Sequence, residues 1–198
     1  MSESRPVTGL VLAAGGSERY GSPKQLAVLE GRPLLEHVVA ALVDSALERI
    51  VVVLGSNGPR VLAETDLGPA EIVICRDWAK GMSAWLKAGI RAVSDAPAAL
   101  VVLGDQPRLS TASVARVLDA RRPDVDLIRA TYGGKPGHPA LLESGIFERI
   151  GGLQGDRGAG SIAADVATAL VPCDDLGWPG DVDTIEDLRR LERGGSAP

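Results

Sequence analysis

The 198-residue chain is long enough for one domain with a sizeable core. Its formal net charge of −5 argues against a nucleic-acid-binding protein, which needs a basic face, and no run of like charges indicates a membrane-binding surface. Hydrophobic residues make up 45% of the chain but aromatic residues only 3%. The core must therefore consist of Val, Leu, Ile and Ala, which suits buried parallel strands.

The cysteines and the N-terminal sequence predict a cytoplasmic protein. Cys75 and Cys173 are far apart and belong to no C-x-x-C or Cys/His pattern, so we expect two buried, reduced thiols. Two histidines are too few for a histidine-rich metal site. No segment has the roughly 18 apolar residues of a membrane span. Residues 1–6 are too short and polar for a signal peptide.

Apolar runs alternate with segments of helical periodicity through the first 120 residues. Strands are expected at 7–14, 49–55, 71–75 and 98–104, and helices at 33–45, 59–66, 82–94 and 110–121. Pro33 suits the first turn of its helix, and Ser110 is the expected N-cap of another. Four such units predict a mostly parallel sheet, with ligands bound beyond the carboxyl ends of its strands.

The pattern is less regular after residue 122. Strands are expected at 126–132 and 138–142 around a GGKPG turn, followed by a glycine-rich loop at 151–160, a strand at 168–173 and a closing helix at 184–193. We expect a single domain over residues 1–198, with halves at 1–122 and 123–193 and a disordered tail at 194–198.

A glycine-rich loop with two cations follows the first expected strand. The sequence LAAGGSERYGSPK runs from Leu12 to Lys24 and includes Arg19. Glycines let consecutive backbone N–H groups point into one concavity, which suits phosphate oxygens, and the two cations add positive charge there. The spacing is neither a Walker A loop nor G-x-G-x-x-G. An ordinary turn with two exposed surface bases is the alternative.

Two acidic segments contain candidates for binding Mg²⁺. Asp105 follows the strand at 98–104, where a carboxylate could hold Mg²⁺ and thereby phosphate oxygens. Asp181 and Asp183 precede the last helix and point the same way from an extended stretch, so one of them could complete the site. A turn residue or a helix cap is the alternative for Asp105, and a helix N-cap is the alternative for Asp181 and Asp183.

Three further segments are candidates for contacting a substrate. Residues 135–139, KPGHP, could contact an acidic substrate, with a plain hairpin turn as the alternative. The loop at 155–160 could receive an anion or be only a linker. The backbone of residues 77–83 could read the edge of a nucleobase. Trp85 is expected to pack against the core, and the same alternative is open for Trp78.

Taken in order, these segments resemble the MobA-like nucleotidyltransferases, and within them the molybdenum cofactor cytidylyltransferases. The resemblance covers residues 7 to about 191. The segments similar to family motifs are LAAGGSERYGSPK, GRPLLEHVV, DWAKGMSAWL, GDQP, KPGHPALL, GDRGAGS and DVDTIEDL. Each match alone is weak, but seven matches in the same order are specific.

The resemblance implies an α/β fold of the Rossmann-like, three-layer α/β/α nucleotide-diphospho-sugar-transferase type, with a mostly parallel sheet. It implies transfer of CMP, or another NMP, from CTP or GTP to the phosphate of a molybdopterin-type cofactor, with Mg²⁺ and with release of pyrophosphate. The nucleotide would bind to the half at 1–122 and the acceptor to the half at 123–193. Ala14, in place of a second Gly after Leu-Ala, is similar to the cytidine-selective motif. A molybdoenzyme or its chaperone is the implied protein partner.

The same resemblance implies roles for individual residues. Arg19, Lys24 and Asp105 would be catalytic, and Asp105 with Asp183 (or Asp181) would bind the metal. The implied nucleotide contacts are Leu12, Ala13, Ala14, Gly15, Gly16, Ser17, Lys24, Gly81, Met82, Ser83 and Asp105. The implied acceptor contacts are Gln106, Lys135, Gly137, His138, Pro139, Gly155, Asp156 and Gly158.

Some positions depart from the family pattern. Trp85 stands where Ser is frequent, and Tyr20 stands where Met or Phe is common. Gly160 follows Ala159 where Arg or Lys is frequent, which removes a possible acceptor-binding charge. Some relatives reduce a pigment intermediate of nicotine breakdown, so an NAD(P)H-dependent oxidoreductase similar to nicotine blue oxidoreductase is an alternative, although G-x-G-x-x-G is missing. A sugar-phosphate nucleotidyltransferase and a non-catalytic nucleotide or cofactor carrier are further alternatives.

Overall fold

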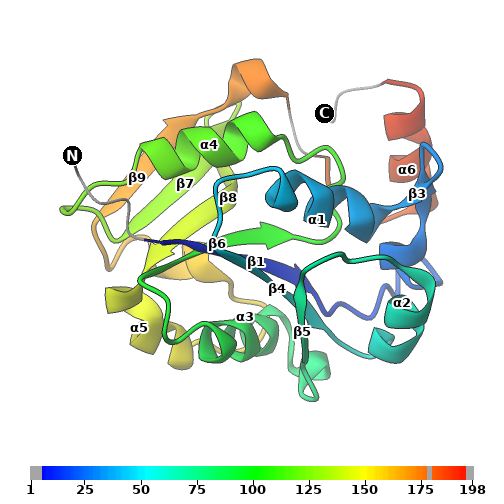
Figure 1. Ribbon diagram of the computed structural model, residues 1–198, viewed down its shortest axis with the longest axis horizontal. Coiled ribbons are helices and arrows are strands. Elements are labelled where there is room, and N and C mark those ends of the chain that lie inside the picture. The colour runs from blue at the N-terminus through cyan, green and yellow to red at the C-terminus, as the bar shows by residue number, and fades with distance from the viewer. Residues whose placement is uncertain (1–5, 178–179, 195–198) are drawn as a thin grey trace.

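The computed structural model describes residues 6–177 and 180–194. A seven-stranded sheet lies at its centre, in the order β5-β4-β1-β6-β8-β7-β9 (Figure 1). Its strands are β1 (Thr8–Ala13), β4 (Arg49–Leu54), β5 (Glu71–Ile74), β6 (Ala98–Leu103), β7 (Leu127–Tyr132), β8 (Lys135–Glu143) and β9 (Thr168–Pro172). A separate two-stranded sheet consists of β2 (Val28–Leu29) and β3 (Arg32–Pro33).

The expectation of a mostly parallel sheet is confirmed. β4 pairs in parallel with both β5 and β1, β1 with β6, and β7 with β9, whereas β8 is antiparallel to both β6 and β7. Gly133 and Gly134 connect β7 to β8 with φ angles of 56° and 73°, as a tight two-residue hairpin requires. The predicted GGKPG turn is therefore too long, because Lys135 already begins β8.

Helices cover both faces of the sheet, which gives three layers (Figure 1). α1 and α4 lie on one face, and α3 and α5 on the other. The α-helices in the described part of the chain are α1 (Leu34–Val43), α2 (Gly58–Glu64), α3 (Met82–Ala92), α4 (Thr111–Asp119), α5 (Phe147–Gly151) and α6 (Ile185–Glu192). Short 3₁₀ helices lie at Lys24–Leu26, Trp78–Lys80, Ser144–Ile146, Ala159–Ile162 and Asp174–Leu176.

The helix ends follow the local sequence. Ser110 caps α4 as predicted, since its hydroxyl accepts a hydrogen bond from the backbone N–H of Ser113 at 3.1 Å. Thr184 and Asp187 form a capping box at the start of α6. Pro33, by contrast, is the residue before α1 and closes β3, so the prediction that it lies inside the helix is wrong by one position.

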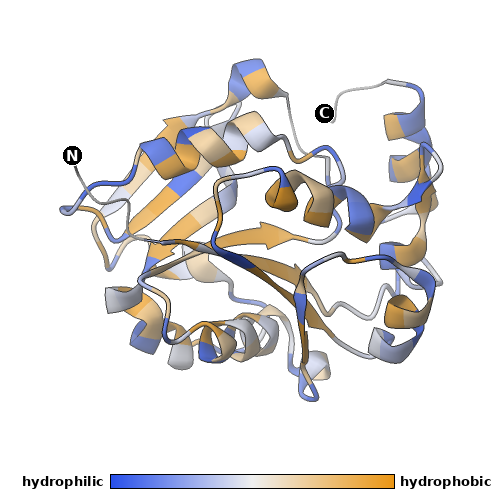
Figure 2. Ribbon diagram, viewed as in Figure 1, coloured by the Kyte–Doolittle hydropathy of each residue, from blue (hydrophilic) through white to orange (hydrophobic). Residues whose placement is uncertain are grey.

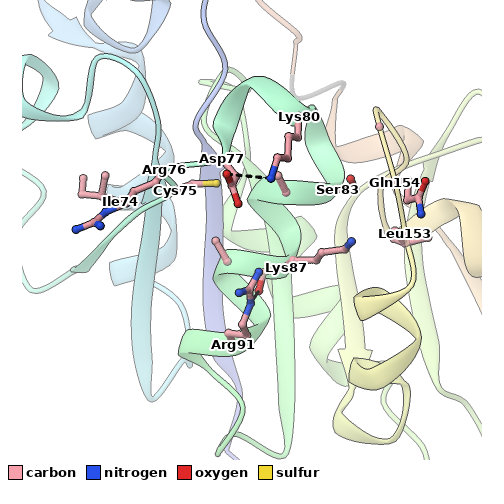
Figure 3. Close-up of a pocket in the computed structure, with 13 residues that line it drawn as sticks. Ile74, Cys75, Arg76, Asp77, Lys80, Ser83, Lys87, Arg91, Leu153 and Gln154 are labelled. Carbon is pink, nitrogen blue, oxygen red and sulfur yellow. Dashed lines mark hydrogen bonds and ion pairs between the residues drawn. The ribbon is translucent and has the colours of Figure 1, made fainter.

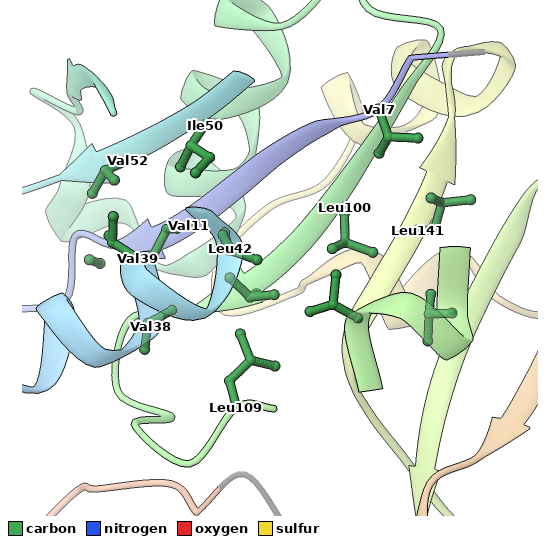
Figure 4. Close-up of a cluster of buried hydrophobic side chains, with 14 of the residues drawn as sticks. Val7, Val11, Val38, Val39, Leu42, Ile50, Val52, Leu100, Leu109 and Leu141 are labelled. Carbon is green, nitrogen blue, oxygen red and sulfur yellow. The ribbon is translucent and has the colours of Figure 1, made fainter. Parts of the chain in front are cut away.

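The core follows from the alternation of side chains along the strands. Val11 and Ala13 of β1 face the cluster under α1 and α4 (Figure 4), whereas Leu10 and Leu12 face the cluster under α3 and α5. β1 is therefore buried on both faces, and the central strands are apolar along their length (Figure 2).

Other expectations have mixed outcomes. Both cysteines are buried and free, as predicted. No helix within 6–177 and 180–194 has the length and apolar character needed to cross a membrane. The sequence analysis missed the five-residue helix α5, and the loop predicted at 151–160 runs into a four-residue 3₁₀ helix that begins at Ala159. Of the tail predicted to be disordered, residues 195–198 lie outside the described residues.

Candidate functional site

A hollow of about 660 Å³ lies at the carboxyl ends of β1 and β6. Five segments line it: the loop after β1, the end of β6 with Asp105, the stretch that leads into α3, the loop that contains Asp156, and the stretch before α6. In chain order these segments are far apart. They meet because the carboxyl ends of neighbouring parallel strands lie at one edge of the sheet.

The loop after β1 offers unused hydrogen-bond donors. The backbone N–H groups of residues 15–19 donate to no other group in the described part of the chain. Ser17 has a positive φ of 59°, and its carbonyl accepts hydrogen bonds from the N–H groups of Tyr20 and Gly21, so the loop folds back on itself. A loop of free N–H groups at a strand end is suited to bind phosphate oxygens.

Gln25 supports this loop and was missed by the sequence reading. Its side chain is buried, and its Nε2 donates to the carbonyl of Ala13 at 2.7 Å and to that of Gly15 at 3.3 Å. Its Oε1 accepts from the hydroxyl of Ser17 at 3.4 Å. A buried amide that is bonded to two backbone carbonyls and to the Ser17 hydroxyl holds the loop in one shape.

Lys24 is the central cation of the hollow. Its Nζ lies 2.6 Å from Oδ2 of Asp105 and 3.0 Å from Oδ1 of Asp183, and Arg19 Nη2 lies 2.9 Å from the other oxygen of Asp183. Burial favours the neutral amine, but the two carboxylates outweigh it and raise the pKa of Lys24. The lysine side chain is only 15% exposed. The alternative of an exposed surface base therefore does not hold for Lys24.

The segment before α6 presents both of its carboxylates to the hollow. Val182, between them, is fully buried against α6, and its N–H donates to the carbonyl of Asp105 at 3.0 Å. Asp181 Oδ1 accepts from Nε2 of Gln106 at 2.6 Å. Burial raises the pKa of Asp181, and the neighbouring carboxylates add to the effect.

The geometry fits a divalent cation that is shared with phosphate. Within residues 6–177 and 180–194, no three His, Cys, Asp or Glu side chains form a ready-made metal site. Mg²⁺, however, usually takes one or two carboxylates and completes its shell with phosphate oxygens and water. Asp105 and Asp183 already share one cation, and Asp105 Oδ1 is buried without a hydrogen-bond partner. These two carboxylates therefore suit the metal.

Two tryptophans form a wall of the same hollow. Nε1 of Trp85 donates to the carbonyl of Trp78 at 2.7 Å, which fixes the two residues relative to each other. Added Cβ atoms would lie 3.2 Å from the Trp85 ring at Gly15 and 3.0 Å from the Trp78 ring at Gly16. The tryptophans thus line the site as well as packing against the core, and the two glycines give the rings the room to do so.

A smaller hollow of about 210 Å³ adjoins the first one, since Leu12 and Met82 line both. It contains Arg129 of β7, His138 of β8 and residues 158–161. Burial and the charge of Arg129 lower the pKa of His138 to about 4. At neutral pH the imidazole is therefore uncharged, and the guanidinium is the cation of this smaller hollow.

A third hollow, of about 680 Å³, lies on the other side of the stretch that leads into α3 (Figure 3). It is basic, because Arg76, Lys80, Lys87 and Arg91 line it. Among its described lining residues the one acidic side chain, Asp77, pairs with Lys80 at 3.1 Å. We call it the basic hollow. Lys24, Asp105 and Asp183 are not among its lining residues.

The residues predicted to contact the nucleotide and the acceptor line different hollows in the structure. Of the expected nucleotide contacts, Ser83 lines the basic hollow, and Ala14 is fully buried behind the glycine loop. The other nine line the 660 Å³ hollow: Leu12, Ala13, Gly15, Gly16, Ser17, Lys24, Gly81, Met82 and Asp105.

The expected acceptor contacts are more scattered. Asp156 lines the first hollow, where its Oδ1 accepts from the N–H of Met82 at 3.3 Å, and Gln106 is buried beside that hollow. His138 and Gly158 line the smaller hollow, and Gly155 lines the basic one. The remaining three lie in β8 and line none of the three hollows: Lys135, Gly137 and Pro139.

A family model described as the MobA-like NTP transferase domain matches residues 9–171. The chain belongs to this family. Within the MobA-like family, the chain is 34% identical over 196 residues to nicotine blue oxidoreductase of Paenarthrobacter nicotinovorans, covering 93% of this chain and 96% of that protein. It is 35% identical over 118 residues to molybdenum cofactor guanylyltransferase of Xanthomonas euvesicatoria, covering 60% and 57% of the two chains.

The chain is also similar to a solved structure of a protein in complex with manganese. The manganese complex of Rv0371c from Mycobacterium tuberculosis superposes with a TM-score of 0.82 at 27% identity, over 95% of this chain and 98% of that chain. The proteins to which this chain is similar thus include one named as a transferase, one named as an oxidoreductase and one solved in complex with manganese.

Proposed function

We propose that the protein transfers CMP from CTP, or another NMP from its triphosphate, to the phosphate of a molybdopterin-type acceptor and releases pyrophosphate. The observation that carries the proposal is the position of Lys24, held between Asp105 and Asp183 beneath a loop of free N–H groups. Cations, carboxylates and backbone donors in one hollow suit a metal-bound triphosphate. Membership of the NTP transferase family supports the same reaction class.

The reaction needs little from a general base. An oxygen of the acceptor phosphate attacks the α-phosphorus, a new P–O bond forms, and the bond to the bridging oxygen of the β-phosphate breaks. The leaving pyrophosphate takes the electron pair. A phosphate monoester has a second pKa of about 6, so it is mostly dianionic at neutral pH. Catalysis then consists of positioning and charge neutralisation.

The proposed roles follow from where the groups lie. The N–H groups of Gly15, Gly16 and Ser17 bind phosphate oxygens, and Arg19 and Lys24 neutralise the departing pyrophosphate.

Asp105 and Asp183 would hold Mg²⁺, which when bound supplies further positive charge to the phosphates. Without ligand, Lys24 neutralises these carboxylates itself, and its amine would turn to the phosphates when they arrive. The division of one domain into a nucleotide half (1–122) and an acceptor half (123–193), the molybdoenzyme or chaperone partner and the cytoplasmic location belong to the same proposal.

A second candidate function is NAD(P)H-dependent reduction of an aromatic substrate. It is favoured by one observation, the similarity to nicotine blue oxidoreductase over nearly the full length of both chains. In this case the hollow lined by Trp78 and Trp85 would take the dinucleotide, and the carboxylates of Asp105 and Asp183 would have no metal to hold.

One experiment separates these functions. Thermal unfolding is measured with CTP, GTP, ATP, UTP, NADH and NADPH, each with and without Mg²⁺. A ligand at about 100 times its Kd adds about 2.7 kcal/mol, which raises the Tm of a chain of this length by roughly 5–10 °C. A Mg²⁺-dependent shift with CTP supports the transferase, and a shift with NADPH alone refutes it.

The acceptor is tested by pyrophosphate release. With the triphosphate that binds best, molybdopterin should give pyrophosphate and a dinucleotide, whereas a sugar 1-phosphate should not. Release with the sugar phosphate would assign the chain to that other transferase class. Tight triphosphate binding without release from any acceptor would indicate a carrier protein.

A further inference from the structure

The 210 Å³ hollow contains a cation without a counter-ion. Arg129 is half-buried on the face of β7 that is covered by α3 and α5, between the fully buried Ile128 and Ala130 of the opposite face. Its hydrogen bond goes from Nη2 to the carbonyl of Pro136 at 3.2 Å, and no carboxylate of the described residues lies within ion-pair distance of it. Burial lowers the pKa of Arg129.

Such a position is energetically unfavourable without an anion. Taking a guanidinium out of water costs free energy unless an opposite charge or a full set of hydrogen bonds compensates. Arginine has five N–H donors, and its fork matches the oxygens of phosphate or carboxylate. One backbone carbonyl uses only part of this capacity.

Gly160 makes the room that the guanidinium occupies. A Cβ built on Gly160 would lie 2.6 Å from Nη1 and 3.0 Å from Cζ of Arg129, so any larger residue would displace the guanidinium. The sequence suggested that Gly160 leaves this side of the site without a positive charge. In the structure Arg129 supplies that charge. The charge comes from β7 instead of from the loop.

The guanidinium of Arg129 lies in the hollow that adjoins the 660 Å³ hollow. Leu12 and Met82 line both hollows, so an anion on Arg129 would be a direct neighbour of a nucleotide in the larger one. His138, the other titratable side chain lining the smaller hollow, has no hydrogen-bond partner for its ring among the described residues. It could donate a hydrogen bond to the same anion.

We propose that Arg129 binds the phosphate monoester of the acceptor, with Gly160 providing the space for its guanidinium. The identity of the anion as the acceptor's phosphate depends on the proposed function, whereas the existence of the anion site does not. A hollow of 210 Å³ has room for one phosphate group and the first atoms attached to it, so the rest of the acceptor extends outside.

The test uses inorganic phosphate as the probe and the ring proton of His138 as the NMR reporter, in the full chain without nucleotide. Phosphate should shift this resonance and raise the pKa of His138, because it neutralises the charge of Arg129. Chloride at equal ionic strength should do neither. Arg129→Gln should weaken phosphate binding about tenfold or more, as expected for the loss of a charge-assisted contact, while Arg129→Lys should retain part of it.

Arg91→Gln is the matched control, since Arg91 also donates to a backbone carbonyl but lies at the basic hollow. Gly160→Ala should weaken binding by displacing the guanidinium, and the double variant Arg129→Ala/Gly160→Arg should restore it by moving the cation to the loop. Unchanged phosphate binding in Arg129→Gln, or no binding by the wild type, would overturn the inference. Nucleotide-induced thermal shifts in the same variants test the proposed function separately.

Discussion

His138 should make the folded protein sensitive to mild acid. Its pKa falls from 6.5 to about 4 on folding because burial and the charge of Arg129 both disfavour the imidazolium. A group whose pKa is lowered by folding contributes its full stability above the unfolded pKa and loses it as the pH falls toward the folded pKa. The fall from 6.5 to about 4 corresponds to at most about 3 kcal/mol.

The window for this loss lies between pH 6.5 and pH 4. At pH 5 about 2 kcal/mol of the stability contributed by His138 should already be lost, which lowers the Tm by roughly 4–8 °C relative to pH 7.5. The measurement is thermal or urea unfolding of the wild type and of His138→Asn across this range. Other groups titrate in both proteins, so the difference between them isolates His138. Equal losses of stability between pH 7.5 and 5 in the two proteins would refute the reasoning.

Three further substitutions test the nucleotide site. Lys24→Ala should cost about 1–3 kcal/mol in the free energy of unfolding, because it leaves Asp105 without its cation and Asp183 with Arg19 alone. Mg²⁺ alone should then raise the Tm of the variant more than that of the wild type, and equal Mg²⁺ effects would contradict this. Asp105→Asn should keep the fold by circular dichroism but abolish Mg²⁺-dependent pyrophosphate release, and unchanged release would remove Asp105 from the site. Gly81→Ala should cost about 1–3 kcal/mol and weaken triphosphate binding in the thermal shift assay, because the residue has a φ of 93° and its Cβ would collide with Asp156. Gly145→Ala, with open space around it, is the matched control and should be nearly neutral.

The sequence predicted the sheet and one half of the site for a simple reason. Buried parallel strands are continuous apolar runs, so the ends of β1 and β6 could be read to within a residue or two. Once those ends were known, parallel topology required the glycine loop and Asp105 to lie at the same edge. The cap at Ser110 depended only on residues next to it in the chain, and it was equally readable.

The features that the sequence reading missed depend on contacts between distant segments. Gln25 supports the loop through carbonyls that lie ten or more residues earlier, and nothing in its own neighbourhood indicates this role. Arg129 looks like an outward-facing residue of a strand until the loop at Gly160 is placed over it. Nothing in the sequence indicated that Lys24 is largely buried between two carboxylates, because these partners lie 81 and 159 residues away in the chain.

The wall between the two adjoining hollows has one rigid side and one adjustable side. Leu12 belongs to a strand buried on both faces and cannot move without disturbing the sheet. Met82 is an unbranched thioether at the first position of α3, in close contact with Gly158, and such a side chain changes rotamer at little cost. The boundary between the two hollows is therefore fixed at Leu12 and can change shape at Met82. Relatives could accept bulkier or smaller second substrates by changing this one side chain while the strands stay as they are.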